Sequence, residues 1–248
     1  MDGVLPVYKP VGITSYDCVR RVKRFLPRRY KIGHAGTLDP FADGVLLLLL
    51  GHATKRFDEV QGWKKTYRAV ARLGSSSDTL DMTGKIDSRL EIQDFRLTKK
   101  RIEDIAQQFV GRVTQEIPAY SAAKVAGQPR YKYARKGETV TAKTKPITIY
   151  SIEVVAVTHD QAELAVVCGS GTYIRQLSYD IFKKIGIDSY LERLTREAVG
   201  EITGANCATL DELATLDMIQ SRLMLFPGGL DGSSESLGVK RETHPVSS

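Results

Sequence analysis

Apolar and polar positions along the chain follow two periods, which predict short strands and amphipathic helices. An unbroken apolar run from Val45 to Leu50 predicts a buried strand, and alternation from Lys65 to Leu73 predicts a second strand. Apolar residues three and four positions apart predict helices from about Thr14 to Leu26 and from Thr98 to Phe109. Further strands are expected at Val4–Tyr8, Ile147–Val157 and Ala162–Cys168, and further helices at Ala53–Val60, Pro129–Arg135, Tyr173–Ile185 and from Tyr190 to about Leu194.

The order of these elements indicates the fold class. Strands come in clusters with helices between them, without the regular strand–helix alternation of a parallel sheet, so we expect an α+β fold with a mainly antiparallel sheet flanked by helices. Residues 75–85 form a polar, Ser- and Asp-rich loop long enough to be functional. From 227 to 248 the chain has almost nothing apolar to bury, which predicts a disordered tail.

Positive charge is concentrated in two blocks of a chain whose net charge is +7. Residues 20–31 hold seven basic residues and no acid, and residues 121–145 hold seven basic residues and one acid. Each block suits either a polyanion or a solvated helix face. Tyrosines interleaved with the second block favour RNA, because rings can stack on exposed bases. The candidate RNA contacts are Arg28, Arg29, Lys124, Arg130, Arg135 and Lys136.

Composition argues against several classes of protein. No apolar stretch approaches the roughly 20 residues of a membrane-spanning helix, and the N-terminus has no signal or transit pattern. Cys18, Cys168 and Cys207 are far apart and are typical of free thiols in a reducing compartment, so we expect a soluble cytoplasmic protein. The histidines form no cluster at metal-ligand spacing, and neither common phosphate-loop motif is present, so no metal or cofactor is expected.

One short segment, residues 33–43, carries the main chemical signal. A glycine-flanked Asp39-Pro40 turn leads directly into the apolar run that begins at Val45. Glycine permits unusual turns, and Pro40 biases Asp39 towards an extended conformation. This arrangement presents one carboxylate at the end of a buried strand. Taken alone, a structural turn feeding a core strand is the commoner explanation.

The motifs around this segment favour a functional carboxylate over a purely structural turn. Eight motifs, in order from about Val4 to Ile202, resemble the TruB family of tRNA pseudouridine synthases, and their shared order makes the resemblance specific. They are Lys9–Ser15, Gly33–Pro40 with Gly44–Leu46, Gly51–Lys55, Lys65–Tyr67, Leu73–Gly74 with Asp78–Asp81, Pro118–Ala122 continuing to Arg135, Gly171–Arg175, and Leu191–Leu194.

The resemblance implies the pseudouridine synthase fold, with an insertion at about 119–145 that clamps RNA. It implies isomerisation of a uridine in the T-arm loop of tRNA, at position 55, to pseudouridine after the base is flipped out. Asp39 falls on the family's catalytic aspartate, which acts as a nucleophile on the uracil or the sugar, or as a base on the ribose. The reaction involves no redox change and consumes no water, so a carboxylate can carry it without a metal or cofactor.

Other site residues also follow from the resemblance. Arg175 matches the arginine that pairs with the catalytic carboxylate and orients it. Tyr67 matches the ring that stacks on the target base, and Leu191 matches an apolar residue lining the uracil pocket. Without the family, each of the three is at least as well explained as a surface or core residue.

Further positions carry weaker assignments. His34 matches a histidine beside the flipped nucleotide. Lys9 belongs to the first motif, where it supports the floor of the site or touches phosphate, and Tyr173 shapes the loop around the site arginine. Asp43 and Asp81 lie near the motifs, and we assign them no role beyond turn and loop structure.

The end of the chain departs from the family pattern. Bacterial members commonly continue into a small RNA-binding PUA domain, whereas only about 45 residues follow Ile202 here. We therefore expect a catalytic domain at 1–226, no complete PUA domain, and a monomer that binds the T-arm stem-loop. Two alternatives stay open: an RNA chaperone that does not need Asp39, and a guide-RNA-dependent relative with a similar Gly-Thr-Leu-Asp-Pro motif.

Overall fold

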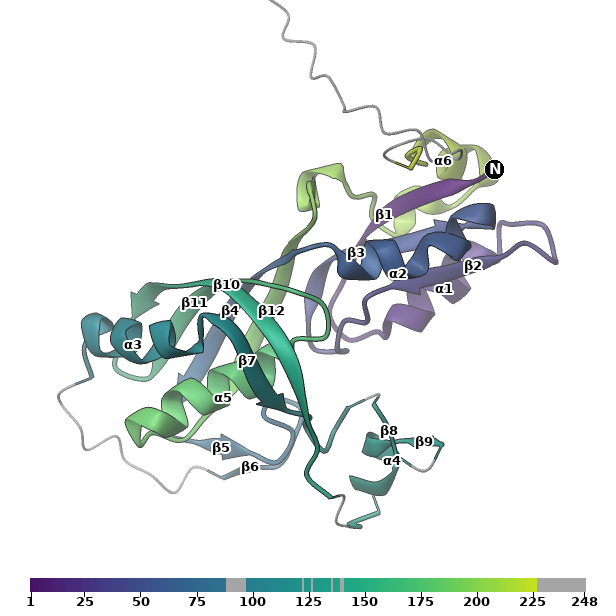
Figure 1. Ribbon diagram of the computed structural model, residues 1–248. Coiled ribbons are helices and arrows are strands. Elements are labelled where there is room, and N and C mark those ends of the chain that lie inside the picture. The colour runs from purple at the N-terminus through teal and green to yellow at the C-terminus, as the bar shows by residue number, and fades with distance from the viewer. Residues whose placement is uncertain (88–96, 122, 126, 135, 139–140, 227–248) are drawn as a thin grey trace, which may run out of the picture.

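The computed structural model describes residues 1–87, 97–121, 123–125, 127–134, 136–138 and 141–226 (Figure 1). Arg135 and the predicted tail from Pro227 lie outside these residues. In the part of the chain that is described, no helix is long and apolar enough to cross a membrane.

A large mixed sheet organises the described residues. Its main path follows the order β1-β3-β12-β4-β11-β10-β7. Off this path, β2 pairs with β3 and β13 pairs with β12. The strands are β1 Gly3–Lys9, β2 Ile32–Ala35, β3 Asp43–Leu50, β4 Lys65–Leu73, β7 Gly111–Glu116, β10 Thr144–Val157, β11 Gln161–Cys168, β12 Ser189–Val199 and β13 Ile202–Thr203. Two small hairpins pair β5 Ser76–Ser77 with β6 Ile86–Asp87, and β8 Lys124–Val125 with β9 Gln128–Pro129.

The helices cover the sheet in two groups. In the half that contains β4, β10 and β11, α3 and α5 pack on one shared apolar core; in the other half, α1 and α2 lie beside β1, β2 and β3 (Figure 1). Figure 1 also shows α6 next to β1, where Val4 and Met224 exchange backbone hydrogen bonds. The helices are α1 Ser15–Lys23, α2 Phe57–Gly62, α3 Lys99–Ala106, α4 Arg130–Ala134, α5 Ile174–Ile185 and α6 Leu216–Ser221.

The predicted fold class is confirmed, since the sheet is mixed, mainly antiparallel and flanked by helices. Among the described strand ladders, only the one between β3 and β12 is parallel. The helix predicted from Tyr190 is wrong, because this segment is β12, which hydrogen-bonds to β4 along most of its length. Strands β2 and β7 were not predicted from the sequence.

Gly44 explains how the two halves of the sheet meet. β3 and β12 pair over only two residues, Asp43 with Thr195 and Gly44 with Arg196. Gly44 has a φ of 107°, and a Cβ there would lie 2.2 Å from the carbonyl oxygen of Arg196. Only glycine fits such a backbone contact. The loop that carries Asp39 therefore enters β3 at the junction between the two halves.

Candidate active site

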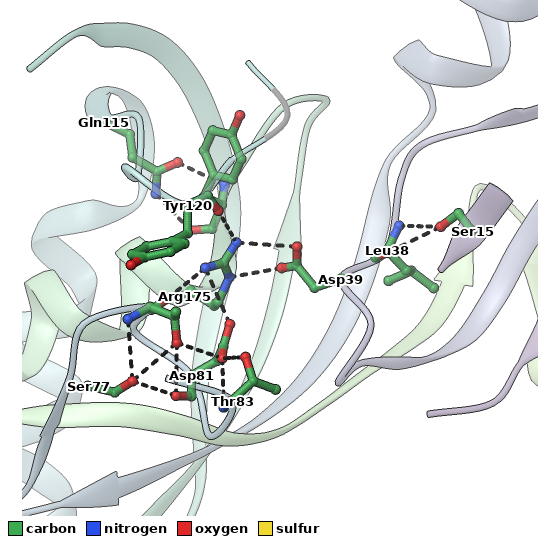
Figure 2. Close-up of polar contacts among 11 residues, drawn as sticks. Ser15, Leu38, Asp39, Ser77, Asp81, Thr83, Gln115, Tyr120 and Arg175 are labelled. Atoms are coloured by element: carbon green, nitrogen blue, oxygen red, sulfur yellow. Dashed lines mark hydrogen bonds and ion pairs between the residues drawn. The ribbon is translucent and has the colours of Figure 1, made fainter. Parts of the chain in front are cut away.

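Asp39 lies in the loop between β2 and β3, and neighbouring segments hold this loop in place. The backbone N–H of Leu38 donates to Ser15 Oγ at 2.9 Å, and Ser15 lies in the first turn of α1 (Figure 2). The N–H of Gly12 donates to the carbonyl of Pro40 at 2.7 Å. The loop is thus fixed on both sides of Asp39, which positions its carboxylate.

The guanidinium of Arg175 holds the Asp39 carboxylate in a two-pronged contact. Arg175 Nε and Nη2 donate to the two oxygens of Asp39 at 2.9 and 3.2 Å. Nη2 also donates to the carbonyl of Tyr120 at 3.0 Å, and Nη1 donates to the carbonyl of Thr79 at 2.6 Å and lies 3.3 Å from Asp81 Oδ2 (Figure 2). Four hydrogen bonds and a second ion pair therefore hold the guanidinium in place.

The two carboxylates on Arg175 differ in their access to solvent. The Asp39 side chain is 36 % exposed, whereas those of Arg175 and Asp81 are 4 % and 6 % exposed. A bidentate contact fixes a carboxylate in orientation as well as in position. Arg175 therefore orients the Asp39 carboxylate, while the exposed part of this side chain stays accessible to a substrate.

Asp81 is a site residue that the sequence analysis missed. Its Oδ1 accepts from the hydroxyl of Thr79 at 2.8 Å and from the backbone N–H of Thr83 at 2.9 Å, while Oδ2 faces Arg175. Because donors from its own loop and the guanidinium of Arg175 both surround it, the buried Asp81 carboxylate holds the loop as well as Arg175. The Asp78-Thr79-x-Asp81 motif was the available signal, but its turn-like composition concealed the contact.

Gln115 fixes the start of the helix that carries Arg175. Its side-chain amide donates to the carbonyl of Tyr173 at 3.0 Å and accepts from the N–H of Tyr173 at 2.8 Å. Tyr173 is the N-cap residue of α5, and Lys145 Nζ lies 4.1 Å from the centre of its ring. Burial raises the pKa of the Tyr173 hydroxyl. Tyr173 thus lies at the start of α5, with contacts to Gln115 and Lys145.

Tyr67 and His34 lie beside the Asp39 loop from different strands. Tyr67, in β4, belongs to the same buried cluster as Leu38, and burial raises the pKa of its hydroxyl. His34, in β2, has a pKa lowered by burial and then by the charge of Arg196, which favours the neutral ring. Its Nδ1 is buried and has no hydrogen-bond partner in the described part of the chain.

Lys9 and Leu191 do not present open surface. Lys9 is fully buried; its Nζ donates to the carbonyls of Pro10 at 2.8 Å and Pro40 at 3.5 Å, and burial lowers its pKa. Lys9 thus bonds to two backbone carbonyls, one of them directly after Asp39 in the chain. Leu191 is also fully buried, and its backbone N–H and C=O bond to Leu80 and Met82, on either side of Asp81. In this structure it contributes to the core and fixes the Asp81 loop.

Arg196, in β12, is a second functional candidate that sequence reasoning missed. Its Nε donates to the carbonyl of Val45 at 2.6 Å and its Nη2 donates to the carbonyl of Gly36 at 3.0 Å. These residues stand at the two ends of the Asp39 loop, so one side chain ties both ends together. Arg196 is 1 % exposed and forms no ion pair within the residues that the structure describes.

The candidate RNA contacts divide into exposed and buried side chains. Arg28, Arg29 and Lys136 are exposed. Arg130 is a correction, because its buried guanidinium donates to the carbonyls of Pro118 and Thr141 at 3.3 and 3.0 Å and so braces the insertion internally. Lys124 lies in β8, and its side chain, like Arg135, is outside the described part.

Within the described residues, no group of three or more His, Cys, Asp and Glu side chains is placed to hold a metal ion. The acidic and basic side chains around Arg175 instead satisfy one another. Asp43, which had no assigned role, accepts a hydrogen bond from the hydroxyl of Tyr8 at 3.2 Å.

Comparisons with known proteins identify the family of this chain. The family model for the TruB family pseudouridylate synthase (N terminal domain) matches residues 23–174. The chain is 40% identical over 228 residues to tRNA pseudouridine synthase B of Oceanobacillus iheyensis, covering 90% of this chain and 75% of that protein. It is 39% identical over 213 residues to the Clostridium acetobutylicum protein of the same name, covering 86% and 72%.

Solved structures show the same fold at lower identity. A chain in the crystal structure of a Cbf5-Nop10-Gar1 complex matches with a TM-score of 0.65 and 24% identity, covering 90% of this chain and 60% of that one. A chain of an H/ACA RNP bound to a substrate RNA containing 2'-deoxyuridine matches with a TM-score of 0.61 at 24% identity, covering 86% and 52%. The family model matches more than half of the chain and the relatives are about 40% identical, and this chain therefore belongs to the TruB family of pseudouridylate synthases, a family of isomerases.

Proposed function

We propose that the protein converts the uridine at position 55, in the T-arm loop of tRNA, to pseudouridine, with Asp39 as the catalytic carboxylate. The observation that carries this proposal is the bidentate contact of Arg175 with a carboxylate that stays 36 % exposed. The curated relatives named above, which share about two fifths of their aligned residues with this chain, are tRNA pseudouridine synthases B.

The proposed reaction balances without a second substrate. The bond between ribose C1′ and uracil N1 breaks, the uracil turns, and a bond forms between C1′ and C5. The proton on C5 leaves and N1 gains a proton, so nothing is oxidised or reduced. The Asp39 carboxylate either attacks the uracil or C1′ of the sugar, or takes a proton from the ribose. Each route needs one oriented carboxylate that a nucleotide can approach.

A base within a loop stack must leave the stack before it reaches Asp39. We assign Tyr67 to contact with the flipped base, since its buried ring lies in the same cluster as Leu38. His34 takes the position beside the flipped nucleotide as a neutral ring, because burial and Arg196 both lower its pKa. Tyr173 supports the same site through its place at the start of α5.

RNA is held outside the reacting base by two surfaces. One is the basic segment with Arg28 and Arg29, and the other is the insertion that contains α4 and Lys136. The insertion reaches the active site directly, because the carbonyl of Tyr120 accepts a hydrogen bond from Arg175. Asp39, Arg175 and both surfaces come from one chain, and we propose that the protein acts as a monomer. The three cysteines are free, which suits the reducing cytoplasm.

A single experiment tests the activity and its catalytic residue. Purified protein, without added RNA or protein partners, is mixed with a T-arm stem-loop transcript tritiated at uridine C5, and released tritium is counted. Wild-type protein is expected to release tritium and Asp39→Asn to release none while still binding the transcript. Release by Asp39→Asn would refute the catalytic assignment. A wild-type protein that needs an added guide RNA would belong to the guided class, and one that only refolds tRNA would be a chaperone.

A further inference from the structure

Arg130 is a buried cation of the insertion, the segment between β7 and β10 that contains β8, β9 and α4 (Figure 1). It is 2 % exposed, and within the described residues it forms no ion pair. The acid of the same basic block, Glu138, lies instead 3.9 Å from Lys136 Nζ. A buried cation without a carboxylate partner costs free energy unless other acceptors surround it. The acceptors that Arg130 uses therefore indicate its role.

A proline ends the strand ladder at the base of the insertion. Beyond the last pair of β7 with β10, the N–H of Ile117 donates to the carbonyl of Lys143 at 2.8 Å. Pro118 follows and has no N–H, so backbone bonding cannot continue. Arg130 supplies the missing donors, because its Nε donates to the carbonyl of Pro118 at 3.3 Å and its Nη1 to that of Thr141 at 3.0 Å. One side chain thus joins the two chain segments at the base of the insertion.

The backbone at the start of α4 bonds to the first of these segments. The N–H of Arg130 donates to the carbonyl of Ala123 at 2.8 Å, and the N–H of Tyr131 donates to that of Ser121 at 3.1 Å. With the side-chain bond to Pro118, Arg130 and its neighbour therefore hold the chain both before and after Tyr120. The position of the Tyr120 backbone thus depends on Arg130.

The same segment contacts the active site at two points. The side-chain amide of Gln115 bonds to the backbone N–H and C=O of Tyr173, at the start of α5. Five residues later, the carbonyl of Tyr120 accepts from Arg175 Nη2, which also donates to Asp39 (Figure 2). A shift of this segment would therefore move an acceptor away from the guanidinium that orients the carboxylate.

We infer that Arg130 is a positioning residue of the reaction. It holds the base of the insertion so that the Tyr120 carbonyl stays on Arg175, which in turn orients the Asp39 carboxylate. The inference rests on the proposed function, since it assumes that Asp39 carries the reaction. Arg130 is buried and acts through protein contacts, which distinguishes it from the exposed cations of the insertion. A displacement of about 1 Å at such a contact is enough to slow a reaction strongly.

Two substitutions of Arg130 and one matched control separate positioning from RNA binding. Arg130→Met removes the donors and the charge, and Arg130→Lys keeps the charge but cannot bridge both carbonyls. Lys132→Met removes the same charge from an exposed position of α4. Tritium release from the T-arm stem-loop is followed with protein in excess over RNA. This gives the rate constant at saturating protein and the protein concentration at half that rate.

The rate constant at saturating protein should fall about 10- to 100-fold in Arg130→Met and by a smaller factor in Arg130→Lys. Lys132→Met should keep the wild-type rate constant. If Arg130→Met changes only the half-saturating concentration, Arg130 serves RNA binding and the inference is wrong. A wild-type rate constant in Arg130→Lys would also overturn it, because the bridge between the two carbonyls would then not be needed.

Hydrogen exchange provides a measurement that does not depend on activity. In folded Arg130→Met or Arg130→Lys, amides should exchange faster at Ile117 and also in the first turn of α5, where the N–H of Tyr173 donates to Gln115. Faster exchange confined to the insertion would reduce Arg130 to a stabiliser of the insertion alone. If wild-type protein releases no tritium, the proposed function fails, whereas exchange in α5 still decides whether Arg130 acts on the helix that carries the site arginine.

Discussion

Asp39 and Asp81 share one guanidinium, yet their replacement by asparagine should have opposite consequences for stability and turnover. Asp81 is buried, and its Oδ1 accepts from Thr79 and Thr83 while Oδ2 faces Arg175. In Asp81→Asn, an amino group replaces one of the two carboxylate oxygens and then faces the hydrogen-bond donors that this oxygen faced. Breaking a buried ion pair by removing one partner costs about 3–5 kcal/mol of the free energy of unfolding.

Asp39 contributes less to stability because water reaches it. With more than a third of its side chain exposed, its contact with Arg175 is screened, and such pairs contribute about 0–1 kcal/mol. Asp39→Asn should therefore unfold at nearly the wild-type urea concentration. With a urea dependence of about 2–3 kcal/mol per molar, Asp81→Asn should unfold roughly 1–2 M earlier.

For turnover, Asp39→Asn should be affected more strongly than Asp81→Asn. Asp39→Asn is expected to release no tritium from the labelled T-arm stem-loop. Asp81→Asn, assayed without urea, should keep a measurable rate, lowered about 100-fold at most, because it misplaces Arg175 without removing the reacting group. The reasoning is refuted if both variants unfold at the same urea concentration, or if Asp81→Asn is as inactive as Asp39→Asn while fully folded.

Three further predictions concern residues around the site. Gly44→Ala should prevent stable folding, because its Cβ would overlap the Arg196 carbonyl; soluble yield and circular dichroism check this, and a wild-type melting curve would contradict it. Arg196→Met should lower kcat about 100-fold with little change in KM for RNA, since it frees both ends of the Asp39 loop; a change confined to KM would argue against a positioning role. The free energy of unfolding should fall as pH rises from about 9 to about 11, because burial raises the pKa of the Cys18 and Cys168 thiols to about 11 and the unfolded chain loses these protons first. Urea titrations should show a smaller fall in Cys18→Ala than in wild type, and equal falls would exclude this cause.

Segments whose apolar residues form one clear run or one clear period were predictable from sequence. The apolar run of β3 and the alternation of β4 predicted their strands directly, and the helix predicted from about Thr14 is α1, with Thr14 as its N-cap. β12 was missed because its sequence mixes apolar and charged residues at spacings that also suit a helix. Its identity depends on pairing with β4, a partner more than 100 residues away. Local pattern carries no information about such a contact.

The site was predictable only as far as motifs identify residues. Asp39 and Arg175 were found, and the structure brings them together. Asp81, Arg196 and Arg130 were misjudged for a common reason, because the sequence gives the charge of a side chain but not its burial. Arg130 lies in a basic block and yet points inward, while Asp81 lies in a polar loop and yet faces a buried cation. Both outcomes depend on tertiary contacts that neither composition nor spacing records.

The many contacts of the Arg175 guanidinium also bear on how this protein can evolve. Its planar fork donates four hydrogen bonds to three groups and forms an ion pair with a fourth, and lysine, with three donors and no fork, cannot replace it. We therefore expect that no other residue type can replace arginine at position 175. The sequence of the insertion is less restricted, because Arg175 donates to a backbone carbonyl there, that of Tyr120, which any residue can supply. Its exposed side chains and length can adapt to new RNA partners while the catalytic contact is preserved.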